Sequence, residues 1–98
     1  MANRRPAPAE RRQVFYSGHV QGVGFRYTVR QLAQNYAVAG FVRNLPDGRV
    51  ELVAEGPPAE LDRFLTAIAE RMAGQIRKAT VDVRPAIGEF DGFEIIQD

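Results

Sequence analysis

The stretch QVFYSGHVQGVGFRYTVRQL (residues 13–32) changes its hydrophobic period halfway along, and this change decides how the fold begins. Its first part, residues 13–19, is rich in β-branched and aromatic side chains and is bounded by glycine, which is typical of a strand. The apolar side chains of Phe25, Val29 and Leu32 then recur on one face of a helix. The stretch therefore predicts a strand, a glycine-rich loop and a helix in succession.

Beyond this stretch, the sequence predicts a hairpin, a second helix and two further strands. The turn signal LPDG (residues 45–48) joins the strands of the hairpin, because Pro presets φ, Asp bonds its own backbone and Gly tolerates positive φ. The second helix opens on prolines and early acids and carries an apolar stripe. The expected elements are strands at 40–44 and 49–56, a helix at 57–72, a loop at 73–78, and strands at 79–85 and 93–98.

The order of these elements is βαββαβ with a short C-terminal strand. Right-handed βα crossovers place both helices on the same face of a mainly antiparallel sheet. The sequence therefore predicts the α+β class, as a ferredoxin-like split βαβ sandwich. Because this fold hosts many unrelated functions, the function has to be argued from the site.

The length and charge of the chain indicate one small domain. The chain has 98 residues, and its hydrophobic fraction of 45% and charged fraction of 26% are ordinary for a globular protein. Residues 1–11 mix Arg, Pro and Ala and are expected to form a flexible leader, with the domain at residues 12–98. This leader has no apolar run of the kind found in signal peptides, and no membrane span is expected. A monomer is the default at this size.

The charge balance and the residue inventory exclude several classes of function. A net charge of +1 is too small for a protein that coats nucleic acid through many phosphate contacts. Cysteine is absent and there is one histidine, so thiolate catalysis, disulfides and Cys- or His-based metal sites lack their residues. The reducing cytoplasm is the expected location.

The glycine loop between the first strand and the first helix is the strongest local signal. Gly22 and Gly24 let a ligand approach the backbone amides, and the helix adds unpaired N–H groups and the positive end of its dipole. Arg26 in the first turn adds a planar cationic fork, so the loop is suited to phosphate. A Walker A ending is missing, and Tyr27 stands where a dinucleotide fingerprint needs glycine. Taken alone, however, two glycines before a helix are a weak signal and favour a plain connection between strand and helix.

Two segments together resemble the signature sequences of the acylphosphatases, small enzymes that hydrolyse carboxyl–phosphate anhydrides. They are SGHVQGVGFRY (residues 17–27) and AGFVRNLPDGRVELVAEG (residues 39–56). The resemblance covers nearly the whole chain after the leader. It implies hydrolysis of an acyl phosphate to a carboxylate and inorganic phosphate, with no metal, no cofactor and no phosphoenzyme.

The resemblance also assigns roles to individual residues. It implies that Arg26 binds the phosphoryl oxygens and that Asn44 positions the attacking water. The phosphate-binding loop that it implies consists of Gln21, Gly22, Val23, Gly24, Phe25 and Arg26.

Some positions depart from the family pattern or invite another interpretation. Tyr16 and His19 replace more usual aliphatic and basic residues, and the loop after the second helix lacks a Gly-Pro step. Tyr27 and Tyr36 are expected to pack rather than to stack on a substrate. The alternative function is a non-catalytic module that binds phosphate or nucleic acid. The strand at 49–56 argues against RNA binding, because it carries glutamates and no aromatic residue for base stacking.

Overall fold

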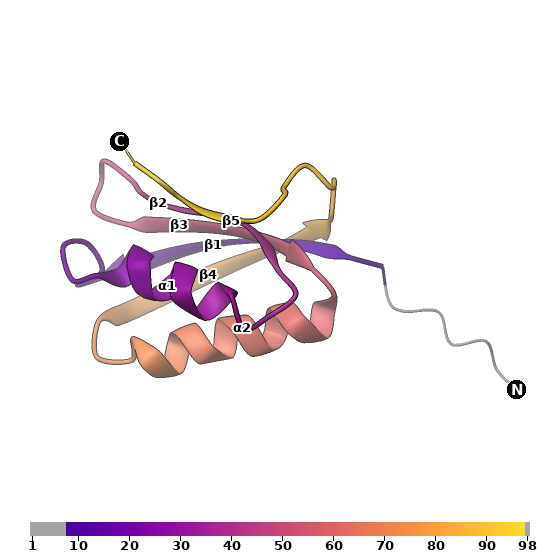
Figure 1. The fold of residues 1–98 in the computed structure, drawn as a ribbon. Helices are drawn as coiled ribbons and strands as arrows, with labels where there is room; N and C mark the ends of the chain where they lie inside the picture. Colours follow the sequence, from indigo (N-terminus) through magenta and orange to yellow (C-terminus); the bar gives the residue numbers. More distant parts are fainter. Residues whose placement is uncertain (1–7, 98) are drawn as a thin grey trace, which may run out of the picture.

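A computed structural model describes residues 8–97 of the chain, which hold five strands and two helices in the order βαββαββ (Figure 1). The α+β class and the predicted element order are confirmed. The elements are β1 (Glu10–Gly18), α1 (Phe25–Ala33), β2 (Ala39–Asn44), β3 (Val50–Gly56), α2 (Pro58–Arg71), β4 (Ile76–Pro85) and β5 (Phe93–Ile96).

The five strands form one sheet in the order β4-β1-β3-β2-β5. Neighbouring strands are antiparallel except β2 and β5, which run parallel. Both helices cover the same face of this sheet, as the ferredoxin-like arrangement requires (Figure 1). The predicted sandwich is therefore confirmed, with β5 as an additional strand beside β2.

The core lies between the helices and the sheet. Along β3, Val50, Leu52 and Ala54 alternate toward the helices and are fully buried, as their spacing predicts. Leu61, Phe64 and Ile68 form the stripe of α2 that packs on them. Burying one such large side chain contributes about 1.5–3 kcal/mol. With no cysteine in the sequence, packing of this core holds the two layers together.

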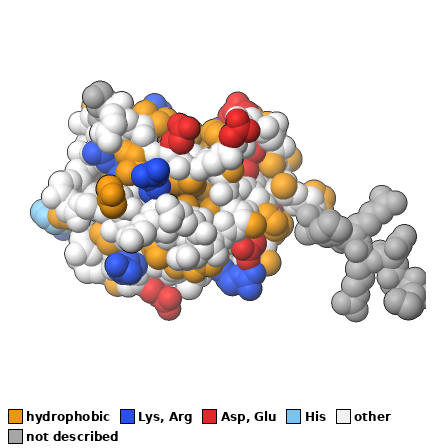
Figure 2. Space-filling view, in the orientation of Figure 1, with side chains coloured by type: hydrophobic (Ala, Val, Ile, Leu, Met, Phe, Trp, Pro, Cys, Tyr) orange, Lys and Arg blue, Asp and Glu red, His pale blue; other side chains and the backbone are white. Residues whose placement is uncertain are grey.

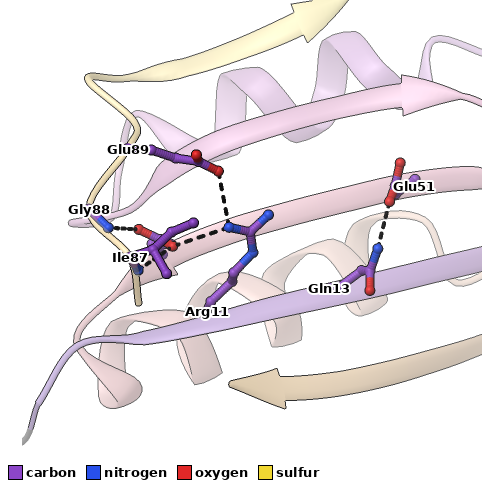
Figure 3. Close-up of polar contacts among 7 residues, drawn as sticks. Arg11, Gln13, Glu51, Ile87, Gly88 and Glu89 are labelled. Atoms are coloured by element: carbon purple, nitrogen blue, oxygen red, sulfur yellow. Dashed lines mark hydrogen bonds and ion pairs between the residues drawn. The ribbon is translucent and has the colours of Figure 1, made fainter. Parts of the chain in front are cut away.

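The sheet face away from the helices carries two buried carboxylates on β3, Glu51 and Glu55. Gln13 Nε2 donates to Glu51 Oε2 at 2.7 Å (Figure 3). Glu55 accepts the backbone N–H groups of Ile87 and Gly88, each at 2.9 Å, so the β4–β5 connection is tied to the centre of the sheet. These partners offset the cost of removing both carboxylates from water.

The first strand begins at Glu10, two residues before the predicted start of the domain. Glu10 pairs with Gly56 of β3, and Arg11 Nη1 lies 3.7 Å from Glu55 Oε2. Ladder pairing on both sides of β1 thus extends the strand into the segment that was expected to be a flexible leader. The rest of that prediction, at residues 1–7, lies outside the described residues.

The fourth strand begins earlier than the sequence predicts. Its first residue, Ile76, pairs with Gly18 of β1 after a register shift, although residues 73–78 were expected to form a loop. The His19 N–H also donates to the Gln75 carbonyl at 2.9 Å. Pairing with β1, a long-range effect, therefore orders a segment whose local sequence suggests a connection.

No helix within residues 8–97 is long and apolar enough to cross a membrane.

Three segments from distant parts of the chain lie at one end of the sheet. The loop before α1, the turn between β2 and β3, and the end of β5 lie together at the left of Figure 1. The glycine loop and the end of β2 therefore lie at the same end of the sheet (Figure 1).

Candidate active site

The glycine loop presents free backbone amides at the start of α1. Gly22 and Gly24 have φ of 76° and 77°, in the left-handed region that favours glycine. Gly24 caps the helix without a side-chain hydrogen bond, and the first turn contains no acidic residue. Backbone N–H groups between left-handed residues form a concavity that attracts anions, and the helix dipole adds to the positive potential.

Apolar side chains anchor this loop from beneath. Phe25 is buried, and its ring centroid lies 5.1 Å from that of Tyr16. Val23 packs against the same core. Burial raises the pKa of the Tyr16 hydroxyl, so this side chain is neutral at physiological pH. The unusual Tyr16 thus supports the loop from below.

Arg26 lies in the first turn of α1, beside the free amides. Its Nη1 donates to the Ile96 carbonyl at the end of β5, at 3.3 Å. This hydrogen bond holds one guanidinium nitrogen against the end of β5. A guanidinium carries five N–H donors, so the remaining donors can bind an anion in the concavity.

Asn44 is the last residue of β2 and lies on the helix-covered side of the sheet. Two residues earlier, Val42 points the same way and is fully buried. The Asn44 Oδ1 atom is buried and has no hydrogen-bond partner among residues 8–97. Leaving a buried acceptor unpaired costs about 1–3 kcal/mol. Within residues 8–97, the carboxamide therefore has an unused acceptor beside the glycine loop.

A pocket of about 160 Å³ brings these groups together. Of the predicted site residues, Gly22, Gly24, Phe25, Arg26 and Asn44 line it, whereas the predicted loop members Gln21 and Val23 do not. The full lining consists of Val20, Gly22, Gly24, Phe25, Arg26, Tyr27, Asn44, Ile95 and Gln97. Within the described residues, this lining holds one cationic side chain and no carboxylate, which suits an anionic ligand.

Sequence reasoning missed the contribution of Tyr27 and of the end of β5. Tyr27 is 68% exposed and lines the pocket, so the prediction that it packs is wrong. Tyr36, in contrast, packs as predicted, with its ring centroid 5.9 Å from that of Phe64. Ile95 and Gln97 reach the pocket because β5 runs parallel to β2. Local sequence carries no signal for that pairing.

His19 is exposed at the start of the loop and does not line the pocket. Its contact with the loop after α2 uses the backbone N–H and not the ring. Among residues 8–97, no group of three or more His, Asp or Glu side chains is placed to hold a metal ion. The donors at this site are amides and a guanidinium, which suit an anion and not a metal cation.

The fold and the pocket define a ferredoxin-like α+β sandwich with a glycine loop suited to an anion ahead of its first helix. The acylphosphatase family model matches residues 12–95. An acylphosphatase of Acaryochloris marina is 45% identical over 82 residues, covering 83% of this chain and 87% of the relative. An acylphosphatase of Archaeoglobus fulgidus is 37% identical over 89 residues, covering 85% and 93%. The chain belongs to the acylphosphatase family.

Solved structures agree with this membership. The crystal structure of the acylphosphatase from Bacillus subtilis superposes with a TM-score of 0.81 at 32% sequence identity. The match covers 90% of this chain and 99% of that one. The similarity therefore extends over nearly all of that chain.

Proposed function

We propose that this protein hydrolyses acyl phosphates to a carboxylate and inorganic phosphate, with Arg26 and Asn44 as its catalytic residues. The observation that carries the proposal is one pocket lined by the glycine loop, by Arg26 and by Asn44. The family membership agrees with this reaction. Hydrolysis of this kind needs a held phosphoryl group and an aligned water, and the pocket offers groups for both.

The phosphoryl group is held by the loop amides and by Arg26. The phosphoryl oxygens carry negative charge that the amides, the helix dipole and the guanidinium neutralise. These donors are in place before the reaction, so they stabilise charge in the transition state without further reorganisation. The carboxylate is already a good leaving group and does not need a metal ion or a strong acid to depart.

The attacking water is oriented by Asn44. Its Oδ1, which has no partner among residues 8–97, accepts a hydrogen bond from the water and directs the water oxygen at phosphorus. The new bond forms between that oxygen and phosphorus. The bond from phosphorus to the acyl oxygen breaks, and its electron pair leaves with the carboxylate. The proton of the water passes to a phosphate oxygen of the substrate.

Further features of the function stay predictions. Basic and acidic side chains are interspersed over the face shown in Figure 2, and the chain has a net charge of only +1. These features support a small-molecule substrate over a nucleic acid. Activity as a monomer in the cytoplasm also remains a prediction.

The wild-type protein should hydrolyse benzoyl phosphate in the presence of excess EDTA, because the proposed donors are all protein groups. Inorganic phosphate should inhibit competitively, since the same amides and Arg26 bind product and substrate. The measurement is the loss of benzoyl phosphate absorbance at several phosphate concentrations. An aryl phosphate monoester serves as the control and should be hydrolysed far more slowly, because its leaving group is poorer. A strict requirement for Mg²⁺ or Zn²⁺ would contradict the proposal.

A further inference from the structure

The Gln21 side chain belongs to the glycine loop but points away from the pocket. Its Nε2 donates to the Leu45 carbonyl at 2.8 Å and to the Arg49 carbonyl at 2.9 Å. Both acceptors lie in the turn between β2 and β3, and the side chain is partly buried between the loop and this turn. A single carboxamide thus joins two segments that are more than twenty residues apart in the sequence.

The two acceptors sit at the two ends of one turn. Leu45 follows Asn44 directly, and its N–H donates to the Arg49 carbonyl at 2.8 Å. That bond closes the turn, and the Gln21 side chain binds the turn from the side of the glycine loop. Both N–H groups of the Gln21 carboxamide are used. A replacement side chain therefore needs two donors on one nitrogen to make both bonds.

We propose that Gln21 is a positioning residue, which fixes Asn44 at its working distance from the amides of the glycine loop. The inference rests on the proposed function, because it concerns the geometry of that reaction. Arg26 and the loop amides come from one segment, whereas Asn44 comes from another. Alignment of the water over the bound phosphoryl group therefore depends on how the two segments are joined. A displacement of about 1 Å in such a geometry costs on the order of 10²-fold in rate.

A purely structural role would look different in experiment. A hydrogen bond that only stabilises the turn would change the free energy of unfolding and leave turnover per folded molecule unaltered. A positioning role changes kcat, and it changes kcat only while Asn44 is present. Phosphate binding should be little affected in either case, because the amides of the glycine loop and Arg26 stay in place.

The primary test compares Gln21→Met with Gln13→Met. Methionine has a similar length and cannot donate. Gln13 is a matched control, because its Nε2 also makes a part-buried hydrogen bond, to Glu51 on the opposite face of the sheet (Figure 3). Gln21→Met should lower kcat for benzoyl phosphate about tenfold or more, with a similar phosphate inhibition constant. Gln13→Met should keep the wild-type kcat.

The second arm repeats Gln21→Met in an Asn44→Ala background. If Gln21 acts through Asn44, the further loss of kcat there should be less than about twofold. Circular dichroism confirms that each variant is folded at the assay temperature. If Gln21→Met does not fold, Gln21→Asn carries the test, because its donors remain on a shorter stem that cannot reach both carbonyls, and its kcat should also fall.

The outcomes separate this inference from the proposed function. An active wild type with equal kcat in Gln21→Met and Gln13→Met would overturn the role of Gln21 alone. Additive losses in the Asn44→Ala background would overturn it as well. A wild type that does not hydrolyse benzoyl phosphate would refute the proposed function, and the inference that rests on it.

Discussion

At the scale of single residues, the Asn44 carboxamide connects the geometry of the pocket to the chemistry. Its Oδ1 is buried without a partner among residues 8–97, and it lines the same pocket as Arg26. The two side chains differ in what they offer. Arg26 supplies charge and several donors, whereas Asn44 supplies a neutral acceptor whose state does not vary with pH. Binding of phosphate and alignment of water should therefore be separable by mutation.

Replacement of Asn44 by Ala should depress kcat while leaving the phosphate inhibition constant almost unchanged. The expected loss is on the order of 10²-fold, as for other single preorganised hydrogen-bonding groups. Stability should change little, because the variant loses the packing of a partly buried side chain at a strand end but also removes a buried acceptor that has no partner among residues 8–97. Steady-state kinetics and phosphate inhibition on the same folded variant make the measurement. An unchanged kcat would leave Asn44 as a turn residue and assign the water to the loop amides.

At the scale of elements, the position of α1 depends on contacts at both of its ends. Its start is held by the buried Phe25, and the segment after its end is tied to α2 by Glu60. The Ala37 N–H donates to Glu60 Oε1 at 2.9 Å, and Arg63 pairs with the same carboxylate. These contacts link the α1–β2 connection to the first turn of α2.

The Glu60 contact should make part of the stability depend on pH. The Ala37 N–H and then Arg63 lower the pKa of this carboxyl group below its ordinary value of 4.5. The stabilisation is therefore complete above that value and is lost as the pH falls through the lowered folded-state pKa. Glu60→Gln should show a slightly lower melting temperature than wild type at pH 7, with the difference closing in acid.

Thermal unfolding at several pH values tests this expectation. Glu70→Gln on the same helix serves as the control, because Glu70 is exposed and, among residues 8–97, makes neither the hydrogen bonds nor the ion pair that Glu60 makes. A Glu60→Gln difference that persists unchanged below the ordinary carboxyl pKa would show that the contact does not act through its charge.

At the scale of the whole molecule, local pattern together with the right-handed crossover rule predicted the elements and the sandwich, but not the pairing of β5 or the early start of β4. The period change before Phe25 and the turn signal at residues 45–48 are local, and both helices and the hairpin appear where they indicate. The pairing of β5 with β2 is not local, so the sequence did not reveal that Ile95 reaches the pocket. The early start of β4 has the same cause.

The candidate site shows a similar division. Glycines with positive φ and a basic residue in a first helical turn have a direct physical signature, which singled out Gly24 and Arg26 before the fold was known. The direction in which a loop side chain points has no such signature in the sequence. The resemblance placed Gln21 in the phosphate-binding loop without a prediction for its side chain, which contacts the β2–β3 turn. Tyr27 was assigned to packing, although it is largely exposed at the pocket.

The central claim is that the pocket at the start of α1 is the place where acyl phosphates are hydrolysed. The measurement that tests it most directly is kcat/KM for benzoyl phosphate in wild type and in Arg26→Ala. Arg30→Ala is the matched control, because Arg30 lies one turn further along α1, is exposed and does not line this pocket.

Arg26→Ala should lose at least about 10²-fold in kcat/KM together with its affinity for phosphate. The reason is that the variant lacks the charge-assisted donors that stabilise the transition state. Arg26→Lys should recover only part of the loss, because an ammonium group cannot make the bidentate contact. Arg30→Ala should remain close to wild type. Turnover of benzoyl phosphate by Arg26→Ala at nearly the wild-type rate would contradict the account.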